Sequence, residues 1–111
     1  MKRIQWDIEE MVAMVDLYYR YENGKISNLS KELNHLSKRL VNRADILKIE
    51  HDNKYRNTNG MNMIFQNVRY VDTDGETGFS SASQLVYDVV KLYKDDYKKF
   101  EQILNDFNSK Y

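Results

Sequence analysis

The sequence predicts a mainly α-helical protein, a compact bundle of four to five helices with a helix-turn-helix-like arrangement. Apolar residues recur at intervals of three and four over several long stretches, which is the period of an amphipathic helix. The chain has no proline and four glycines, which favours long helices with few breaks. At 111 residues, the chain is predicted to form a single domain, residues 1–111.

Composition excludes several classes of protein. The absence of cysteine excludes disulfides and thiolate zinc sites. No apolar run approaches the roughly 18–20 residues that span a bilayer. The N-terminal stretch turns acidic within a few residues and lacks the apolar core of a secretory signal. We therefore expect a cytoplasmic protein with no membrane contact.

The zero net charge is unevenly distributed. Between Lys25 and Arg69 there are nine basic and four acidic residues, a formal charge of +5, whereas the flanking segments carry −2 and −3. A basic middle segment suits contacts with phosphates by one face of the protein. Its positive charge is nevertheless smaller than that expected of a protein that binds DNA tightly. An ordinary mixed surface is the alternative interpretation.

The first helix is predicted to begin near Asp7, which forms a capping-box pair with Glu10. It is predicted to end at Asn23-Gly24, residues that adopt the left-handed conformation of a helix C-terminus. Its apolar stripe consists of Ile8, Met11, Val12, Val15, Tyr18 and Tyr19.

A second helix is predicted after Ser27 or Asn28. Its apolar seam consists of Leu29, Leu33, Leu36 and Leu40. Lys38 and Arg39 lie off this seam, where they either contact backbone phosphates or simply face solvent. Residues 42–54 give the weakest pattern, in which Ile46, Leu47 and Ile49 suggest a short helical turn or an extended piece that packs on the core.

The most informative stretch is residues 55–70. Its apolar positions, all on one helical face, are Met61, Ile64, Phe65 and Val68. A second face carries Asn62, Gln66 and Arg69, and the helix is predicted from about Thr58 to Val71. Asn and Gln pair with adenine and Arg with guanine, so this polar face suits a DNA groove. It suits the polar groups of a protein partner nearly as well.

Arg56 and Asn57 precede this helix, where the helix dipole attracts anions. Arg56 and the free N–H groups of the first turn would together bind a phosphate. The alternative is that Asn57 or Thr58 only caps the helix, while Arg56 pairs with an acidic neighbour such as Asp52.

A resemblance to a known family rests on three groups of residues, which are Trp6-x-x-Glu9 with Leu17-Tyr18, the segment LSKELNHLSKRL, and Arg56-Asn57-x-x-Gly60-x-x-Met63-x-x-x-Asn67. From Trp6 to about Leu104, the chain resembles the helical, helix-turn-helix-like N-terminal domain of HNH-type restriction endonucleases and related phage-defence proteins. The resemblance implies DNA or substrate recognition, with cleavage by a nuclease domain that would follow. This sequence carries no such nuclease domain, so only the recognition role transfers.

The last third of the chain is predicted to be a turn-rich loop followed by helix. Asp74-Gly75 leaves open a short β-hairpin near residues 70–80. An amphipathic helix or helix pair is predicted from about Ser81 to Asn108, with Ser81 and Gln84 as a capping box and a break at Lys94-Asp95-Asp96. An uncovered apolar face on this C-terminal helix would suit a homodimer.

The motifs of common enzyme classes are missing from the sequence. There is no P-loop, dinucleotide fingerprint, His-Glu-x-x-His pair or nucleophile elbow. His35 and His51 lack the carboxylates of a nuclease or metal site at a defined spacing. We therefore expect no enzymatic activity, no metal and no cofactor.

Two functions remain as hypotheses. The first is a DNA-binding recognition module. The second is a small phage or mobile-element inhibitor, an anti-CRISPR or anti-restriction factor, that binds a nucleic-acid-processing protein such as a defence nuclease. Under either hypothesis the predicted contact residues are Lys38, Arg39, Lys54, Arg56, Asn57, Asn59, Asn62, Gln66 and Arg69.

Overall fold

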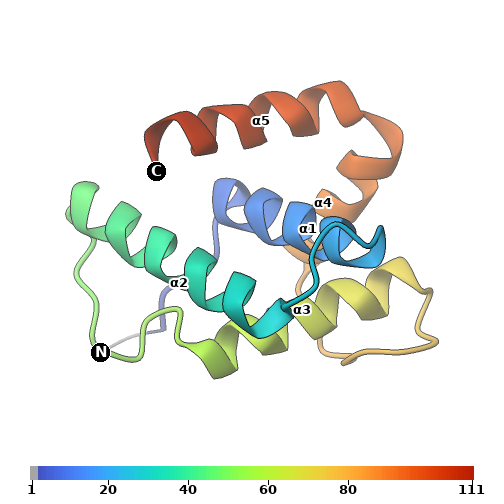
Figure 1. The fold of residues 1–111 in the computed structure, drawn as a ribbon, viewed down its shortest axis with the longest axis horizontal. Coiled ribbons are helices and arrows are strands. Elements are labelled where there is room, and N and C mark those ends of the chain that lie inside the picture. Colours follow the sequence, from blue (N-terminus) through green and yellow to red (C-terminus); the bar gives the residue numbers. More distant parts are fainter. Residues whose placement is uncertain (1–2) are drawn as a thin grey trace.

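The computed structural model describes residues 3–111 and contains five α-helices in that range. They are α1 (Ile8–Glu22), α2 (Leu29–Ile46), α3 (Thr58–Asp72), α4 (Gln84–Asp95) and α5 (Tyr97–Lys110). Figure 1 shows α1 in the middle of the molecule, with α5 on one side of it and α3 on the other. The predicted helical fold class is therefore confirmed.

Helix α1 is the centre of the core. It packs against all four other helices, and its side chains from Glu10 to Val15 are all buried. A helix with buried residues on every side has to be enclosed by other elements. Phe65 of α3 and Phe100 and Phe107 of α5 are fully buried around it.

The predicted starts of the first three helices are confirmed by their caps. Asp7 and Glu10 form both hydrogen bonds of a capping box, at 3.0 and 3.1 Å. The side chain of Asn28 accepts from the N–H of Lys31 at 3.0 Å, and that of Asn57 accepts from the N–H of Gly60 at 2.9 Å. Each cap satisfies an N–H that has no partner within the helix.

A buried ion pair fixes the start of α3. The guanidinium of Arg56, two residues before the helix, donates to both carboxylate oxygens of Glu10, at 2.7 and 2.9 Å. It also donates to the main-chain carbonyls of Ile4 and Gln5 at 3.1 Å. It lies 4.2 Å from the ring centroid of Tyr55. The acidic partner of Arg56 is thus Glu10 from α1 instead of its neighbour Asp52.

A second polar cluster joins α3 to α1 and α4. The hydroxyls of Tyr18 and Tyr19 donate to the carboxylate of Asp72 at 2.8 and 2.6 Å, and Lys94 lies 3.2 Å from the same carboxylate. Burial alone would raise the pKa of Asp72. Hydrogen bonds from Tyr19, Tyr18 and Lys94 outweigh the burial and hold that pKa below its ordinary value.

The lowered pKa of Asp72 predicts a loss of stability in acid. A carboxyl whose pKa is lower in the folded state stabilises the protein above its unfolded pKa of about 3.9, and this contribution is lost as the pH falls through the folded pKa. We expect Asp72→Asn to lower the free energy of unfolding at neutral pH by about 1–3 kcal/mol. The variant should also show a weaker loss of stability between about pH 5 and pH 2.

Urea unfolding at a series of pH values measures both effects. Asp95→Asn is the matched control, since Asp95 is an exposed carboxylate on α4. An acid-induced loss of stability as steep in Asp72→Asn as in the unaltered chain would show that Asp72 is not its source.

Three predictions for the ends of helices and for the loops are wrong. Ile46 and Leu47 do not pack on the core, because they lie at the end of a longer α2 and are 55% and 46% exposed. Ser81 and Gln84 do not form a capping box, because α4 starts at Gln84, whose side chain donates to Asp88 further along the helix at 2.9 Å.

The third wrong prediction is the hairpin considered near residues 70–80. The loop after α3 folds back along that helix and forms hydrogen bonds with it. Within residues 3–111 there is no β-strand. The N–H of Phe79 donates to the carbonyl of Gln66 at 3.0 Å, and the side chain of Asn67 donates to the carbonyl of Phe79 at 2.9 Å. By contrast, the predicted break at Asp95-Asp96 is confirmed, since Asp96 caps α5 by accepting from the N–H of Lys99.

Candidate functional site

The exposed side of α3 carries side chains that end in amides. Asn59 and Asn62 are exposed, and Gln66 is half-buried one turn further along. Met63, between them on the same side of the helix, is 49% exposed. The opposite side of α3 is buried in the core through Met61, Phe65 and Val68, as predicted. Of the predicted polar face only Asn62 is exposed, whereas Gln66 and Arg69 are half-buried.

Helix α2 lies beside the first turn of α3. The hydroxyl of Thr58 donates to the side-chain oxygen of Asn34 at 2.8 Å, and the hydroxyl of Ser37 donates to the carbonyl of Arg56 at 2.6 Å. Lys38 is exposed and follows Asn34 by four residues, which places it one turn further on the same side of α2. We call the surface formed by Asn34, Lys38, Asn59, Asn62 and Met63 the α3 face.

The other predicted contact residues have different positions. Lys54 is exposed in the loop before α3, and its N–H donates to the side chain of Asp52 at 2.9 Å. Asn57 is exposed, but its side-chain oxygen is used as the cap of α3. Arg69 is partly buried over the ring of Phe65 and lies 3.5 Å from the carboxylate of Glu22.

Arg56 and Arg39 do not lie on the α3 face. The guanidinium of Arg56 is buried between α1 and the residues before α1, where it donates to the four acceptor atoms described above. It is therefore not available to bind a phosphate at the start of α3. Arg39 turns to the opposite side of α2, where it donates to Asn108 of α5 at 2.8 Å. These two placements remove both arginines from the candidate surface.

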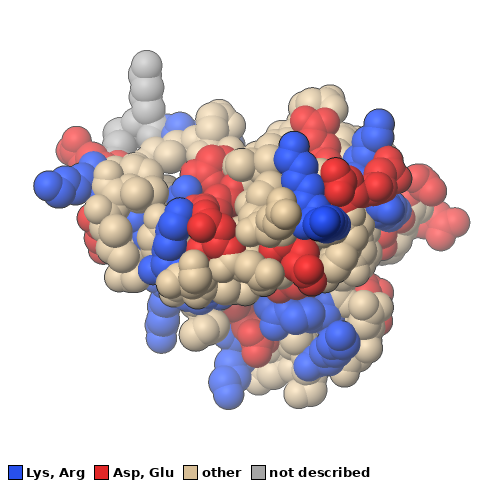
Figure 2. Space-filling model, turned by 90° about the horizontal axis from the view of Figure 1, so that it is seen from above, with Lys and Arg blue, Asp and Glu red and all other residues tan. Residues whose placement is uncertain are grey.

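Charged side chains of both signs lie on the surface outside the α3 face (Figure 2). His51 and Asp45 form an exposed pair, with 2.7 Å between Nε2 and the carboxylate. The hydrogen bond that His51 donates to the carboxylate of Asp45 raises the pKa of His51 above its ordinary value. Figure 2, which looks onto the side that carries α5, shows acidic and basic side chains interleaved there. Within residues 3–111, no group of three or more His, Asp or Glu side chains could hold a metal ion.

Two residues of the α3 face were absent from the predicted contact set. Met63 follows Asn59 by four residues, so its spacing alone places it among the amides. Asn34 could not be assigned in this way, because its position beside α3 depends on how α2 and α3 pack. The sequence signal for Met63 was present, whereas the signal for Asn34 lies in the tertiary structure.

Comparison with known proteins gives no relative. No family model, no curated protein and no solved structure matches the chain. In the described part of the chain, no helix is both long and apolar enough to cross a membrane. The function therefore has to be argued from the surface itself.

Proposed function

We propose that this protein is a non-catalytic recognition module that binds duplex DNA through the α3 face. The observation that carries the proposal is the exposure of Asn59 and Asn62 on successive turns of a helix whose other side is anchored in the core. Amide side chains on a rigid helix can donate to and accept from base edges in the major groove.

The surroundings of α3 support the same function. Lys54 is exposed in the loop before α3, and Lys38 is exposed on α2 next to Ser37, whose hydroxyl donates to the Arg56 carbonyl. Exposed lysines near a recognition helix can contact backbone phosphates. The bond between Thr58 and Asn34 and the bond between Ser37 and the Arg56 carbonyl hold α2 against this turn. Such support fixes the orientation of side chains that read bases.

We expect Asn62→Asp to weaken binding to duplex DNA by about tenfold or more. The substitution removes the amide donor and places a negative charge on the side facing the phosphates. A mobility assay at low salt with a pool of random duplexes measures the change. The matched control is Asn105→Asp, which introduces the same charge at an exposed position of α5 and should leave binding nearly unchanged.

Two results would contradict the DNA-binding proposal. One is the absence of any salt-dependent shift with the unaltered chain. The other is equal weakening by Asn62→Asp and Asn105→Asp, which would indicate a general charge effect without a specific face.

A second candidate function is favoured by Met63. Its side chain is 49% exposed on the same side of α3 as Asn59 and Asn62, and flexible methionines suit protein-binding surfaces. This observation supports the small inhibitor that binds a defence nuclease, in the class of anti-CRISPR or anti-restriction factors. Only this function predicts a stoichiometric complex with the nuclease on a sizing column without nucleic acid, which Met63→Lys would abolish.

A further inference from the structure

The loop between α2 and α3 is closed by the ring of His51. The Nε2 atom of this ring lies 2.7 Å from the carboxylate of Asp45 in the last turn of α2, and its Nδ1 atom lies 3.1 Å from the main-chain oxygen of Asp52. The ring also stacks on that of Tyr55, which is buried, with 4.9 Å between the two centroids. His51 therefore joins the end of α2 to the residues that precede α3.

Both polar contacts can be made by only one protonation state of the ring. A main-chain carbonyl and an ionised carboxylate accept hydrogen bonds and donate none, whereas a neutral imidazole carries a single N–H. A neutral His51 would leave one ring nitrogen with its lone pair directed at an oxygen. The imidazolium donates from both nitrogens, so the position of the ring corresponds to the charged form. The same contacts, that with Asp45 first, raise the pKa of His51 above its ordinary value.

The groups that face His51 come from α2 and from the loop itself. Asp45 faces it from α2, and Asp52 and Tyr55 face it from the loop. Burial and the charge of Glu10, which contacts the Tyr55 hydroxyl from α1, raise the pKa of Tyr55 to about 12, so this phenol stays neutral where an imidazole titrates. Histidine is the side chain that ordinarily changes its charge near neutral pH, so the charge of this cluster there is set by His51.

The backbone of the loop has a disfavoured conformation at both ends. Lys48 and Arg56 have φ of +58° and +49°, the left-handed region that residues with side chains rarely adopt. The Arg56 end is held by the buried ion pair with Glu10, at 2.7 Å. Around Lys48, the side-chain contact is that between His51 and Asp45, which lie three residues after and three residues before it. One end of the loop is thus held by an arginine that is always charged, and the other by a histidine that has to be protonated.

We propose that His51 is a pH-dependent latch, which holds the α2–α3 loop closed when it is protonated and releases the loop when it loses that proton. A histidine whose pKa is raised by folding stabilises the folded form below its unfolded pKa of about 6.5, and this contribution is lost as the pH rises through the folded pKa. The latch is therefore closed at about pH 6 and opens as the solution becomes more alkaline. The inference depends on the contacts of His51 and is independent of what the α3 face binds.

NMR spectra of the full chain between about pH 5 and pH 9 test the latch, because they follow the histidine rings and the backbone amides separately. We expect the amide signals of Lys48, Asp52 and Tyr55 to shift with the same midpoint as the ring of His51. The N–H of Tyr55 donates to the main-chain oxygen of Asp52 at 3.3 Å. Above the midpoint, its hydrogen exchange should be about two- to fivefold faster than the ordinary pH dependence of amide exchange predicts, which is the value of one partly exposed ion pair.

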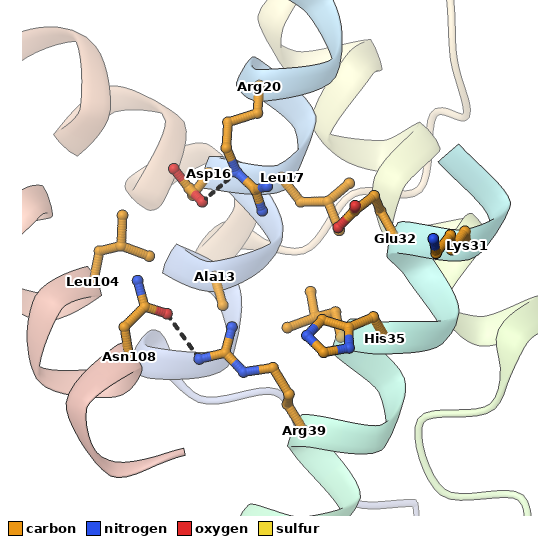
Figure 3. A pocket seen from close by; sticks show the side chains of 11 residues that line it. Ala13, Asp16, Leu17, Arg20, Lys31, Glu32, His35, Arg39, Leu104 and Asn108 are labelled. Carbon is orange, nitrogen blue, oxygen red and sulfur yellow. Dashed lines mark hydrogen bonds and ion pairs between the residues drawn. The ribbon is translucent and has the colours of Figure 1, made fainter. Parts of the chain in front are cut away.

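Three variants separate the latch from other effects of pH. Asp45→Asn should lower the midpoint of His51, because Nε2 loses its charged acceptor. His51→Gln should abolish the common step in the amide signals of the loop. Figure 3 shows His35, the other histidine, on α2 beside the groove between α1, α2 and α5. His35→Gln is therefore the matched control, and it should leave the step unchanged.

Three results would overturn the proposal. The first is a step near neutral pH that persists in the loop amides of His51→Gln. The second is an unchanged His51 midpoint in Asp45→Asn. The third is a set of loop signals that stay constant while the ring of His51 titrates, because the pair with Asp45 would then hold nothing in place.

Discussion

Arg56→Ala is expected to lower the free energy of unfolding by about 3–5 kcal/mol, because it leaves a buried carboxylate without its partner. Glu10 is 1% exposed and Arg56 is 9% exposed, so solvent cannot replace the lost contacts. The guanidinium also satisfies the carbonyls of Ile4 and Gln5. Since domains of this size are stable by only about 5–15 kcal/mol, the change should be evident in urea unfolding followed by circular dichroism.

Arg20→Ala is the matched control for this prediction. Arg20 also pairs with a carboxylate, that of Asp16, but the pair is partly exposed and lies within one helix. Its loss should lower stability by less than about 0.5 kcal/mol. The double replacement Glu10→Leu with Arg56→Met should recover part of the stability lost in Arg56→Ala, because no unpaired charge then remains buried. Equal effects of Arg56→Ala and Arg20→Ala would refute the role given to the buried pair.

Gly78→Ala is expected to lower the free energy of unfolding by about 2–5 kcal/mol, from backbone strain and overpacking together. Gly78 has φ of +96°, where side chains are strained. An added Cβ would also collide with the carbonyl oxygen of Gln66 and lie 2.7 Å from the main-chain nitrogen of Tyr70. These are backbone atoms inside α3, so they cannot move aside as the end of a flexible side chain would.

Gly24→Ala separates the two causes. Gly24 also has a positive φ, of +75°, but no atom lies within 4 Å of an added Cβ. Gly24→Ala should therefore lower the free energy of unfolding only by the cost of backbone strain, about 1 kcal/mol. Thermal unfolding of both variants measures the difference, and a loss in Gly24→Ala as large as that in Gly78→Ala would show that close packing on α3 is not responsible.

The helices could be predicted from the sequence because their signals are local. The spacing of Met61, Phe65 and Val68 identifies the buried side of α3, and the Asp7 and Glu10 pair marks the start of α1. Both depend on residues within one or two turns of each other. For the same reason, the break between α4 and α5 at Asp95-Asp96 could be predicted.

The interactions between helices could not be predicted in this way. The partner of Arg56 is Glu10, 46 residues earlier, and the surface position of Ile46 depends on where α2 ends relative to the core. The groove between α2 and α5 has no sequence signal, because it results from two helices packing on a third. The predicted contact residues were affected most, because Arg56 and Arg39 were expected to contact the partner but contact Glu10 and Asn108 instead.

The surroundings of Arg56 also determine what an optical probe would report. Trp6 is the only tryptophan of the chain, and the guanidinium lies 4.8 Å from its ring centroid. The indole emission of this protein therefore originates beside Arg56, which holds the start of α3 and lies 50 residues later in the sequence. A change in the wavelength or quenching of this emission would therefore report a change in the contact between Trp6 and Arg56 at the start of α3.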